Sequence, residues 1–209
     1  MKIKNLILGP LAVNCYIVRL EKINIIIDPG AEAGNIIDYL DSQNLIPDFI
    51  INTHGHFDHI GAVPELIEKY KIPFYIDSAD EKLIIDPDKN GSSFFGENNL
   101  LLKTYNLINA KDLQYFSKNG IDIIRTPGHS PGSITIRIGD CLFTGDLLFK
   151  ESIGRTDLAG GDVAQIKDSL LKIKNMDRDY LIYPGHGPAT TLKYEIGSNY
   201  YLGNSFIGS

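Results

Sequence analysis

The sequence lacks a long hydrophobic run and an excess of basic charge. Its apolar stretches, such as residues 23–27 interrupted by Asn24, fall far short of the roughly 20 residues that a membrane-spanning helix needs. The first apolar run is broken by Asn5, Gly9 and Pro10, which argues against a signal peptide. The 20 Lys and Arg residues are outnumbered by 26 Asp and Glu residues, giving a net charge of −6. We therefore expect neither membrane nor nucleic-acid binding.

Cysteine is also scarce, since Cys15 and Cys141 are the only two in 209 residues. Two cysteines do not make a disulfide scaffold at this length. Each lies in an apolar, strand-like stretch, which predicts buried structural thiols and fits a reducing, cytoplasmic location. The hydrophobic fraction of 43% and the charged fraction of 22% are ordinary for a globular chain. With no repeat and no linker in sight, we expect one domain over residues 1–209.

Short runs rich in Ile, Val and Leu alternate with helical patterns along the chain. The runs predict strands at residues 3–8, 15–20, 23–27, 49–51, 73–76, 121–124, 134–138, 141–144 and 180–183. Apolar residues at helical spacing predict helices over 32–40, 63–70, 163–173 and 191–200, with Val163 and Leu171 on the apolar face of the third. The polar, turn-rich segment 86–118 fits either an ordered loop over a site or a mobile surface segment. These elements predict a layered α/β or α+β fold.

Histidine carries the strongest signal. Three of the five histidines fall in His54-x-His56-x-Asp58-His59, four metal-capable side chains within six residues. In an extended segment, residues i and i+2 point to the same side, so His54 and His56 can bind one ion. The turn that follows lets Asp58 and His59 face a second ion. Imidazole and carboxylate without thiolate suit Zn(II), Fe(II) or Mn(II), and the further ligands must come from elsewhere in the chain.

Three more candidate donors share one sequence context, in which a β-type run is followed by a turn and then by the donor. His129 follows Pro127-Gly128, Asp146 follows Gly145, and His186 follows Pro184-Gly185. Any one of these alone would be read as a turn residue or a polar side chain with an ordinary partner. That all five histidines should fall at strand ends by chance is a far weaker explanation. Asp146 has two carboxylate oxygens and can bridge two ions.

At this point the chain resembles a known family. The motif His-x-His-x-Asp-His followed by Gly61, together with TPGHSPGS, GDLLF and PGHGP, is similar to the metallo-β-lactamase-fold hydrolases. Residues 152–162 (SIGRTDLAGGD) and 185–191 (GHGPATT) resemble the small bacterial glyoxalase II-like group, the hydroxyacylglutathione hydrolase-like enzymes. The resemblance implies an α+β, αββα four-layer sandwich, with two mixed β-sheets flanked by helices.

The resemblance also implies a division of ligands between two divalent metals, zinc in the first place, with iron or manganese as alternatives. The first ion takes His54, His56 and His129. The second takes Asp58, His59 and His186, and Asp146 bridges the two. The implied activity is that of a binuclear-metal hydrolase in which a metal-bound hydroxide cleaves a small acyl thioester of the S-lactoylglutathione type. Asp58 and Asp146 are then the catalytic carboxylates.

Five further residues receive candidate roles. By resemblance, Asp28 orients a ligand, although a turn residue explains it equally well. Arg155 is a candidate substrate contact, its alternative being a surface ion pair with Asp157, and Phe149 is a candidate pocket wall. Full-length glyoxalase II adds a C-terminal helical region that binds glutathione. Here Lys193 and Tyr194 are the nearest basic and aromatic candidates, so we expect loose recognition of the thiol half.

Three other functions fit the same motifs. The first is a persulfide dioxygenase with a single iron, which shares the Gly-Arg-Thr-Asp element. The second is a lactonase that acts on acyl lactones. The third is a non-catalytic metal-binding module on the same fold, for which we would expect lost ligand positions. The sequence leaves the oligomeric state and the natural acyl group open.

Overall fold

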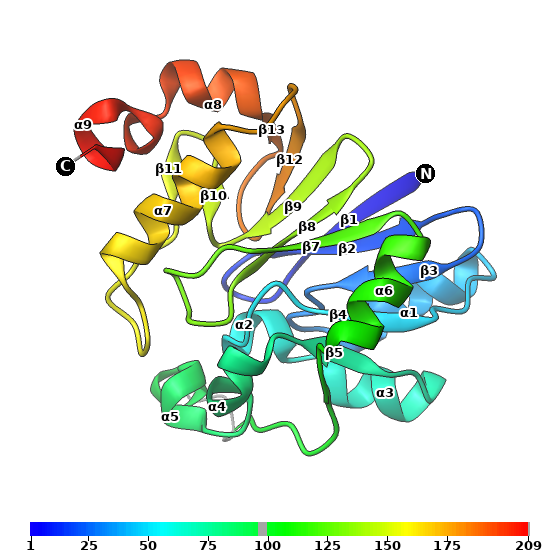
Figure 1. Ribbon diagram of the computed structural model, residues 1–209. Helices are drawn as coiled ribbons and strands as arrows, with labels where there is room; N and C mark the ends of the chain where they lie inside the picture. Colours follow the sequence, from blue (N-terminus) through cyan, green and yellow to red (C-terminus); the bar gives the residue numbers. More distant parts are fainter. Residues whose placement is uncertain (96–99, 209) are drawn as a thin grey trace. The chain divides into compact units, whose positions relative to one another are not determined.

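A computed structural model describes residues 1–95 and 100–208. The chain divides into two compact units, Met1–Ile108 and Asn109–Ser209. Each unit contains a mixed β-sheet and its own helices (Figure 1). In the part of the chain that the structure describes, no helix is long and apolar enough to cross a membrane. The assignment of residues 1–209 to one domain stays a prediction.

The sheet of the first unit joins an antiparallel half to a parallel half. Its strands, in sheet order, are β1 (Lys2–Leu8), β2 (Val13–Arg19), β3 (Asn24–Ile27), β4 (Phe49–Ile51), β5 (Phe74–Ile76) and β6 (Asn106–Leu107). The pairs β1–β2 and β2–β3 are antiparallel, whereas β3 to β6 run parallel. Parallel neighbours need crossover connections. Helices α1 (Ala33–Ser42) and α3 (Val63–Tyr70) lie in two of these connections.

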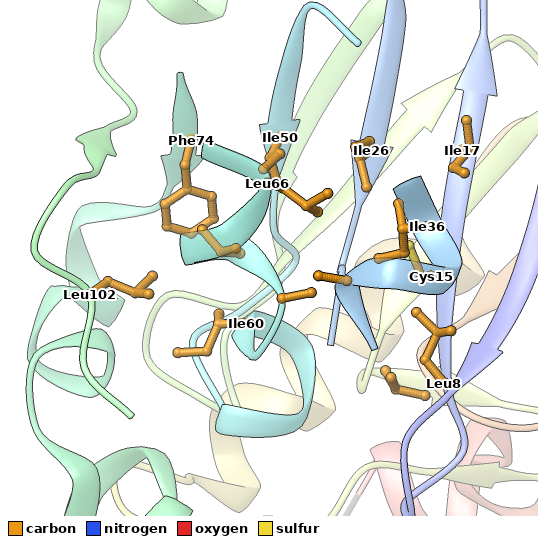
Figure 2. Close-up of a cluster of buried hydrophobic side chains, with 14 of the residues drawn as sticks. Leu8, Cys15, Ile17, Ile26, Ile36, Ile50, Ile60, Leu66, Phe74 and Leu102 are labelled. Atoms are coloured by element: carbon orange, nitrogen blue, oxygen red, sulfur yellow. The ribbon is translucent and has the colours of Figure 1, made fainter. Parts of the chain in front are cut away.

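The core of the first unit lies between the sheet and these two helices. Ile36 and Leu66 bring the buried faces of α1 and α3 onto sheet residues such as Ile26 and Ile50, as Figure 2 shows. Short elements complete the unit: α2 (Phe57–Ile60), η1 (Ser78–Asp80), α4 (Glu81–Ile84), α5 (Pro87–Asn90) and η2 (Ser92–Phe94). The central strands β3 and β4 are apolar and buried on consecutive positions, as is usual for the parallel part of a sheet, whereas β1 is largely exposed.

The second unit has a sheet in the order β13-β12-β9-β8-β7. The elements of this unit are α6 (Ala110–Lys118), β7 (Ile121–Arg125), β8 (Ile134–Ile138), β9 (Cys141–Gly145), β10 (Leu148–Phe149), β11 (Ser152–Ile153), α7 (Val163–Lys174), β12 (Leu181–Pro184), β13 (Thr190–Thr191), α8 (Leu192–Ser198), η3 (Tyr200–Leu202) and α9 (Asn204–Ile207). Strands β9 and β12 are parallel, and the other pairs in this sheet are antiparallel. Ile166, Leu170 and Ile173 of α7 pack with Leu142 and Ile182 of the sheet.

The structure confirms the predicted strands and helices to within a few residues, and one expectation needs correction. Val163 and Leu171 do not belong to the buried face of α7, because they are 49% and 41% exposed. The buried stripe runs through Ile166, Leu170 and Ile173 at i, i+4 and i+7, and Leu171 lies about 100° around the helix from Leu170. The segment 86–118 contains α5, η2, β6 and α6 among its described residues, with 96–99 outside them.

Both cysteines are buried, as the sequence predicts, and both are free thiols. Burial and the nearby Asp28 carboxylate raise the pKa of the Cys15 thiol well above its ordinary value. A thiol with a raised pKa is a poor nucleophile and a poor metal ligand. The candidate metal donors are therefore the nitrogen and oxygen groups alone.

Candidate metal centre

The donor segment of the first unit begins where β4 ends. Residues 52–56 stay non-helical, and His56 has extended backbone angles, before α2 starts at Phe57. The change from extended to helical backbone places His54 and His56 before the turn and Asp58 and His59 within it. Buried Asn52 closes this segment, because its side-chain amide donates a hydrogen bond of 2.7 Å to the carbonyl of His59.

The three imidazoles of this segment form a buried cluster. The ring of His54 has its centre 4.8 Å from that of His56 and 4.1 Å from that of His59. Each of these histidines is at most 4% exposed. The carboxylate of Asp58 has its Oδ2 atom 3.8 Å from Nε2 of His59. Three imidazoles this close in a buried site would repel one another if protonated, so the arrangement favours neutral rings that can accept a cation.

Asp28 lies directly behind this cluster. It is 1% exposed and has a φ of 51°, an uncommon value for a residue other than glycine. Its Oδ1 accepts a hydrogen bond of 2.7 Å from the backbone N–H of Thr53, and its Oδ2 accepts one of 2.6 Å from the Thr53 hydroxyl. The same Oδ2 lies 3.0 Å from Nδ1 of His59. These three contacts hold the strained backbone of Asp28 in place.

The Asp28 contacts fix the tautomers of two imidazoles. An ionised carboxylate only accepts hydrogen bonds, so Nδ1 of His59 carries the proton. The single hydroxyl proton of Thr53 is donated to Asp28, so toward Nδ1 of His54, 3.2 Å away, this hydroxyl can only accept. Nδ1 of His54 is then protonated as well. Both rings keep an Nε2 lone pair, which is the form that a metal ligand needs.

The second unit contributes three candidate donors, the Asp146 carboxylate and two imidazoles close to it. Oδ2 of Asp146, just past β9, lies 3.5 Å from Nε2 of His129 and 3.7 Å from Nε2 of His186. Nδ1 of His129 donates a 2.7 Å hydrogen bond to the backbone carbonyl of Arg155. A carbonyl can only accept, so His129 also has its lone pair on Nε2, the atom that faces Asp146.

Two glycines allow the backbone to pass close to these donors. A Cβ atom on Gly30 would lie 1.6 Å from the carbonyl oxygen of Asp58, and one on Gly154 would lie 1.8 Å from that of Asp146. No side chain fits at either position without moving the donor's own backbone. Steric crowding therefore explains why the motifs Asp-Pro-Gly and Ile-Gly-Arg each contain glycine.

The four candidate substrate residues lie in the second unit. The ring of Phe149 stands edge-on to that of His186, with 6.1 Å between centres, so Phe149 is an apolar neighbour of a candidate ligand. Lys193 and Tyr194 are on the exposed side of α8, where the Tyr194 hydroxyl donates to Glu151. The Lys193 backbone N–H donates to Asp179. The assignment of Lys193 and Tyr194 to substrate binding stays a prediction.

Arg155 forms the surface ion pair that was the alternative to a substrate contact. Its Nε and a terminal guanidinium nitrogen lie 2.6 and 2.8 Å from the two carboxylate oxygens of Asp157. Both side chains are more than 60% exposed. The guanidinium holds the pKa of Asp157 down to about 2, and the carboxylate raises the pKa of Arg155. The contact of Arg155 with a candidate metal ligand is made by its backbone carbonyl, which accepts the hydrogen bond from His129.

Sequence reasoning missed three groups that hold the donors. Thr53 directly precedes His54, and a hydroxyl residue beside a ligand was the signal that could have identified it. Buried Asp80 accepts a 2.9 Å hydrogen bond from the backbone N–H of Gly55, between His54 and His56. Asp80 lies 25 positions away from Gly55 along the chain, so no local sequence pattern indicates this contact. The carbonyl of Arg155 has no signature in sequence, because every residue has one.

The side chains fit divalent-metal binding. Every one of the seven predicted ligands is among the histidine and aspartate side chains that could hold a metal ion. They are His54, His56, Asp58, His59, His129, Asp146 and His186. The set offers five imidazoles and two carboxylates, the ligand types that zinc, iron and manganese accept. The tautomers of His54, His59 and His129 are set for coordination through Nε2.

Comparison with known proteins identifies the family. The profile of the Metallo-beta-lactamase superfamily matches residues 8–186. The chain is 34% identical over 206 residues to "Probable metallo-hydrolase YqgX" of Bacillus subtilis (strain 168), covering 97% of this chain and 98% of that protein. It is 30% identical over 195 residues to "Hydroxyacylglutathione hydrolase GloC" of Haemophilus influenzae (strain ATCC 51907 / DSM 11121 / KW20 / Rd), covering 90% and 92%.

Two solved structures extend the comparison. The crystal structure of BLEG-1 B3 metallo-beta-lactamase matches with a TM-score of 0.87 and 35% identity over 96% of this chain and 99% of that one. That of TTHA1623 in a di-iron-bound form matches with a TM-score of 0.82 and 32% identity over 95% and 99%. The protein belongs to the metallo-β-lactamase superfamily. It has the α+β fold of that family, with mixed β-sheets and flanking helices, and it is a metal-dependent hydrolase by family.

Proposed function

We propose that this protein is a thioesterase of the glyoxalase II-like group, which cleaves a small acyl thioester of the S-lactoylglutathione type. The observation that carries the proposal is the buried cluster of His54, His56 and His59, whose tautomers are set by Asp28 and Thr53. The likeness to a relative named as a hydroxyacylglutathione hydrolase supports the choice of substrate. The motifs at 152–162 and 185–191 add to that support.

The proposal includes a binuclear centre. One ion is assigned to His54, His56 and His129, the other to Asp58, His59 and His186, with Asp146 as a ligand of both. Zinc is the first choice, because the donor set is nitrogen and oxygen without thiolate. The di-iron form of TTHA1623 keeps iron as an alternative, and manganese accepts the same donors.

Bound divalent ions would lower the pKa of a coordinated water toward neutrality and polarise the thioester carbonyl. The chain's own residues then have defined tasks. Asp58 and Asp146 supply negative charge that offsets part of the metal charge, and Asp28 keeps His59 in the coordinating tautomer. Phe149, beside His186, provides an apolar wall. A thiolate is a good leaving group because the pKa of a thiol is low compared with that of an alcohol, so the reaction needs little help from a general acid.

A β-lactamase is the second candidate, because of the 35% identity to BLEG-1. The lactonase and the single-iron persulfide dioxygenase stay alternatives, because they require the same kinds of donor. The described residues retain every predicted ligand position, which argues against a non-catalytic metal-binding module. The cytoplasmic location and the expectation that the protein binds neither nucleic acid nor a membrane stay predictions.

The test combines metal analysis with a substrate panel on one sample. After metal-replete expression, we expect about two divalent ions per chain, with thioester kcat/KM exceeding lactone and β-lactam values by at least tenfold. Removal of the metals with a chelator should abolish turnover, and zinc should restore it. Glutathione persulfide with an oxygen electrode tests the dioxygenase. Clear activity on another class, with no thioester turnover above the chelated control, would reject the thioesterase assignment and leave the family intact.

A separate prediction concerns Arg155. Because its side chain is paired with Asp157, Arg155→Ala should change the KM for a glutathione thioester by less than twofold. The pKa of Asp157 should return from about 2 toward 3.8. Since the pairing depresses this pKa, its contribution to stability is present above pH 3.8 and is lost as the pH falls through 2. An NMR titration of the Asp157 carboxyl measures the shift. A KM increase above fivefold would instead show that Arg155 contacts the substrate.

A further inference from the structure

A pocket of the first unit adjoins the candidate ligand Asp58 and has no role in the chemistry described above. Its volume is about 320 Å³, at the lower end of the range for small-molecule sites. It lies between the β1–β2 turn and the Asp58 segment. The lining residues that matter are Leu8, Leu11, Glu32, Phe57 and Leu100.

Part of the wall of this pocket is formed by apolar side chains, and these are held in place by packing. Phe57 immediately precedes Asp58 and is 8% exposed, and its ring stacks on Phe95 with centres 4.9 Å apart. Leu8 is buried at the end of β1, whereas Leu11 is 39% exposed at the tip of the following turn. A side chain that lines a pocket and is partly exposed has apolar area to bury when a ligand enters.

The charge of the pocket is of one sign. Glu32 and Asp58 are its ionisable groups, and among the described lining residues none is basic. Glu32 is held at the rim, because its Oε1 accepts from the backbone N–H of Gly9 and its Oε2 accepts a 2.6 Å hydrogen bond from Asn35. A ligand carboxylate that reaches the rim would meet the fixed negative charge of Glu32, and no basic side chain among the described lining residues would offset that charge.

We propose that this pocket binds the acyl group of the thioester and selects neutral, apolar chains of four to eight carbons over chains that end in a carboxylate. The inference rests on the proposed function and refines its substrate class. Apolar contacts with Leu8, Leu11, Phe57 and Leu100 supply affinity for the chain, and Glu32 supplies discrimination against anionic ends. Lactoyl is neutral and small, so it is accepted, but it leaves most of this surface uncovered.

The experiment uses thioesters of one uncharged thiol, N-acetylcysteamine, with zinc-loaded protein. From acetyl through butyryl to hexanoyl, kcat/KM should rise about threefold per added methylene, somewhat less than full burial would give. Adipoyl, which matches hexanoyl in length but ends in a carboxylate, should react at least tenfold more slowly than hexanoyl. Equal rates for acetyl and hexanoyl, or for hexanoyl and adipoyl, would overturn the proposal while leaving the thioesterase assignment in place.

Three variants locate the effect. Leu11→Ala should lower the hexanoyl-to-acetyl ratio at least fivefold, and Glu32→Gln should raise the adipoyl-to-hexanoyl ratio at least threefold. Leu113→Ala is the matched control, because Leu113 is 42% exposed and lies on α6 in the other unit. It should leave both ratios within twofold. Unchanged ratios in Leu11→Ala and Glu32→Gln would overturn the proposal.

A binding measurement separates this inference from the proposed function. Hexanamide, an unreactive acyl analogue, should shift the backbone NMR resonances of Gly9, Leu11 and Ala31 in the zinc-loaded protein, and less so in Leu11→Ala. If no thioester is hydrolysed, the proposed function fails, and shifts at these residues still support an acyl pocket. Absence of such shifts at millimolar hexanamide would reject it.

Discussion

Asp146→Ala is expected to remove at least one metal per chain and to lower thioester kcat/KM by more than about a hundredfold. Asp146 has its Oδ2 within 3.7 Å of Nε2 of both His129 and His186, so a single carboxylate serves two candidate ligands. Loss of an outer contact to a metal ligand typically costs 10-fold to 100-fold in affinity or activity, and loss of a shared ligand should cost more. The substitution therefore removes one donor of the second unit and a contact of the two others.

Metal content by mass spectrometry and steady-state kinetics measure this effect, with circular dichroism to confirm folding. Asp146→Asn preserves the shape but removes the charge, so it should fold well and still hydrolyse poorly. Asp140→Ala is the control, since Asp140 is an exposed carboxylate of the same unit that pairs with Arg178. If Asp146→Ala retained two metals and normal turnover, the assignment of Asp146 to both ions would be wrong.

Asp28→Asn is expected to weaken metal binding by about 10-fold to 100-fold. The substitution keeps His54 and His59 but changes which nitrogen of each ring carries the proton. With the amide oxygen kept toward the Thr53 N–H, the amide nitrogen replaces Oδ2. An NH₂ group cannot accept from His59, so the proton of that ring moves to Nε2 and the metal-binding lone pair is lost. The Thr53 hydroxyl is released to donate to Nδ1 of His54, which moves the second proton in the same way.

Thr53→Val separates the two steps, because it removes the link to His54 and leaves the contact between Asp28 and His59. We expect it to cost less affinity than Asp28→Asn. Competition with a chromophoric chelator measures affinity, and ¹⁵N chemical shifts of the imidazoles report the tautomers directly. Asp48→Asn is the control, since Asp48 accepts a backbone N–H from Asn24 in an exposed turn. Unchanged imidazole tautomers in Asp28→Asn would refute the mechanism even if metal binding fell.

Much of the candidate site can be predicted from the sequence, because metal coordination restricts both the residue types and their local spacing. Four of the donors, His54, His56, Asp58 and His59, lie within six consecutive residues. The end of β4 and the start of α2 are therefore enough to bring them together. The three other donors each follow a strand and a turn, which sequence patterns also reveal. The role of Asp28 was undecided between a turn residue and a positioning residue, and its contacts with Thr53 and His59 favour the second.

Other features could not be read from sequence, because they depend on contacts between distant segments. Asp80 supports Gly55 from 25 positions away, and nothing in the local pattern of either residue indicates it. The pairing of Arg155 with Asp157 and the use of its carbonyl by His129 depend on the path of the loop after β11. The helix α6 was missed because Phe116 is its only fully buried side chain, so its apolar periodicity is weak.

The sequence by itself predicted the longer strands and most of the longer helices and indicated the candidate metal donors, because short-range periodicity and ligand spacing are local properties of the chain. Its motifs indicated the family by resemblance. Only the tertiary structure decided which nitrogen of His54, His59 and His129 stays free for a metal, because that depends on the partner of the opposite nitrogen. It also decided that Leu8, Leu11, Phe57 and Leu100 share one pocket beside Asp58. Folding brings these residues together from three separate segments, and their spacing along the chain does not indicate it.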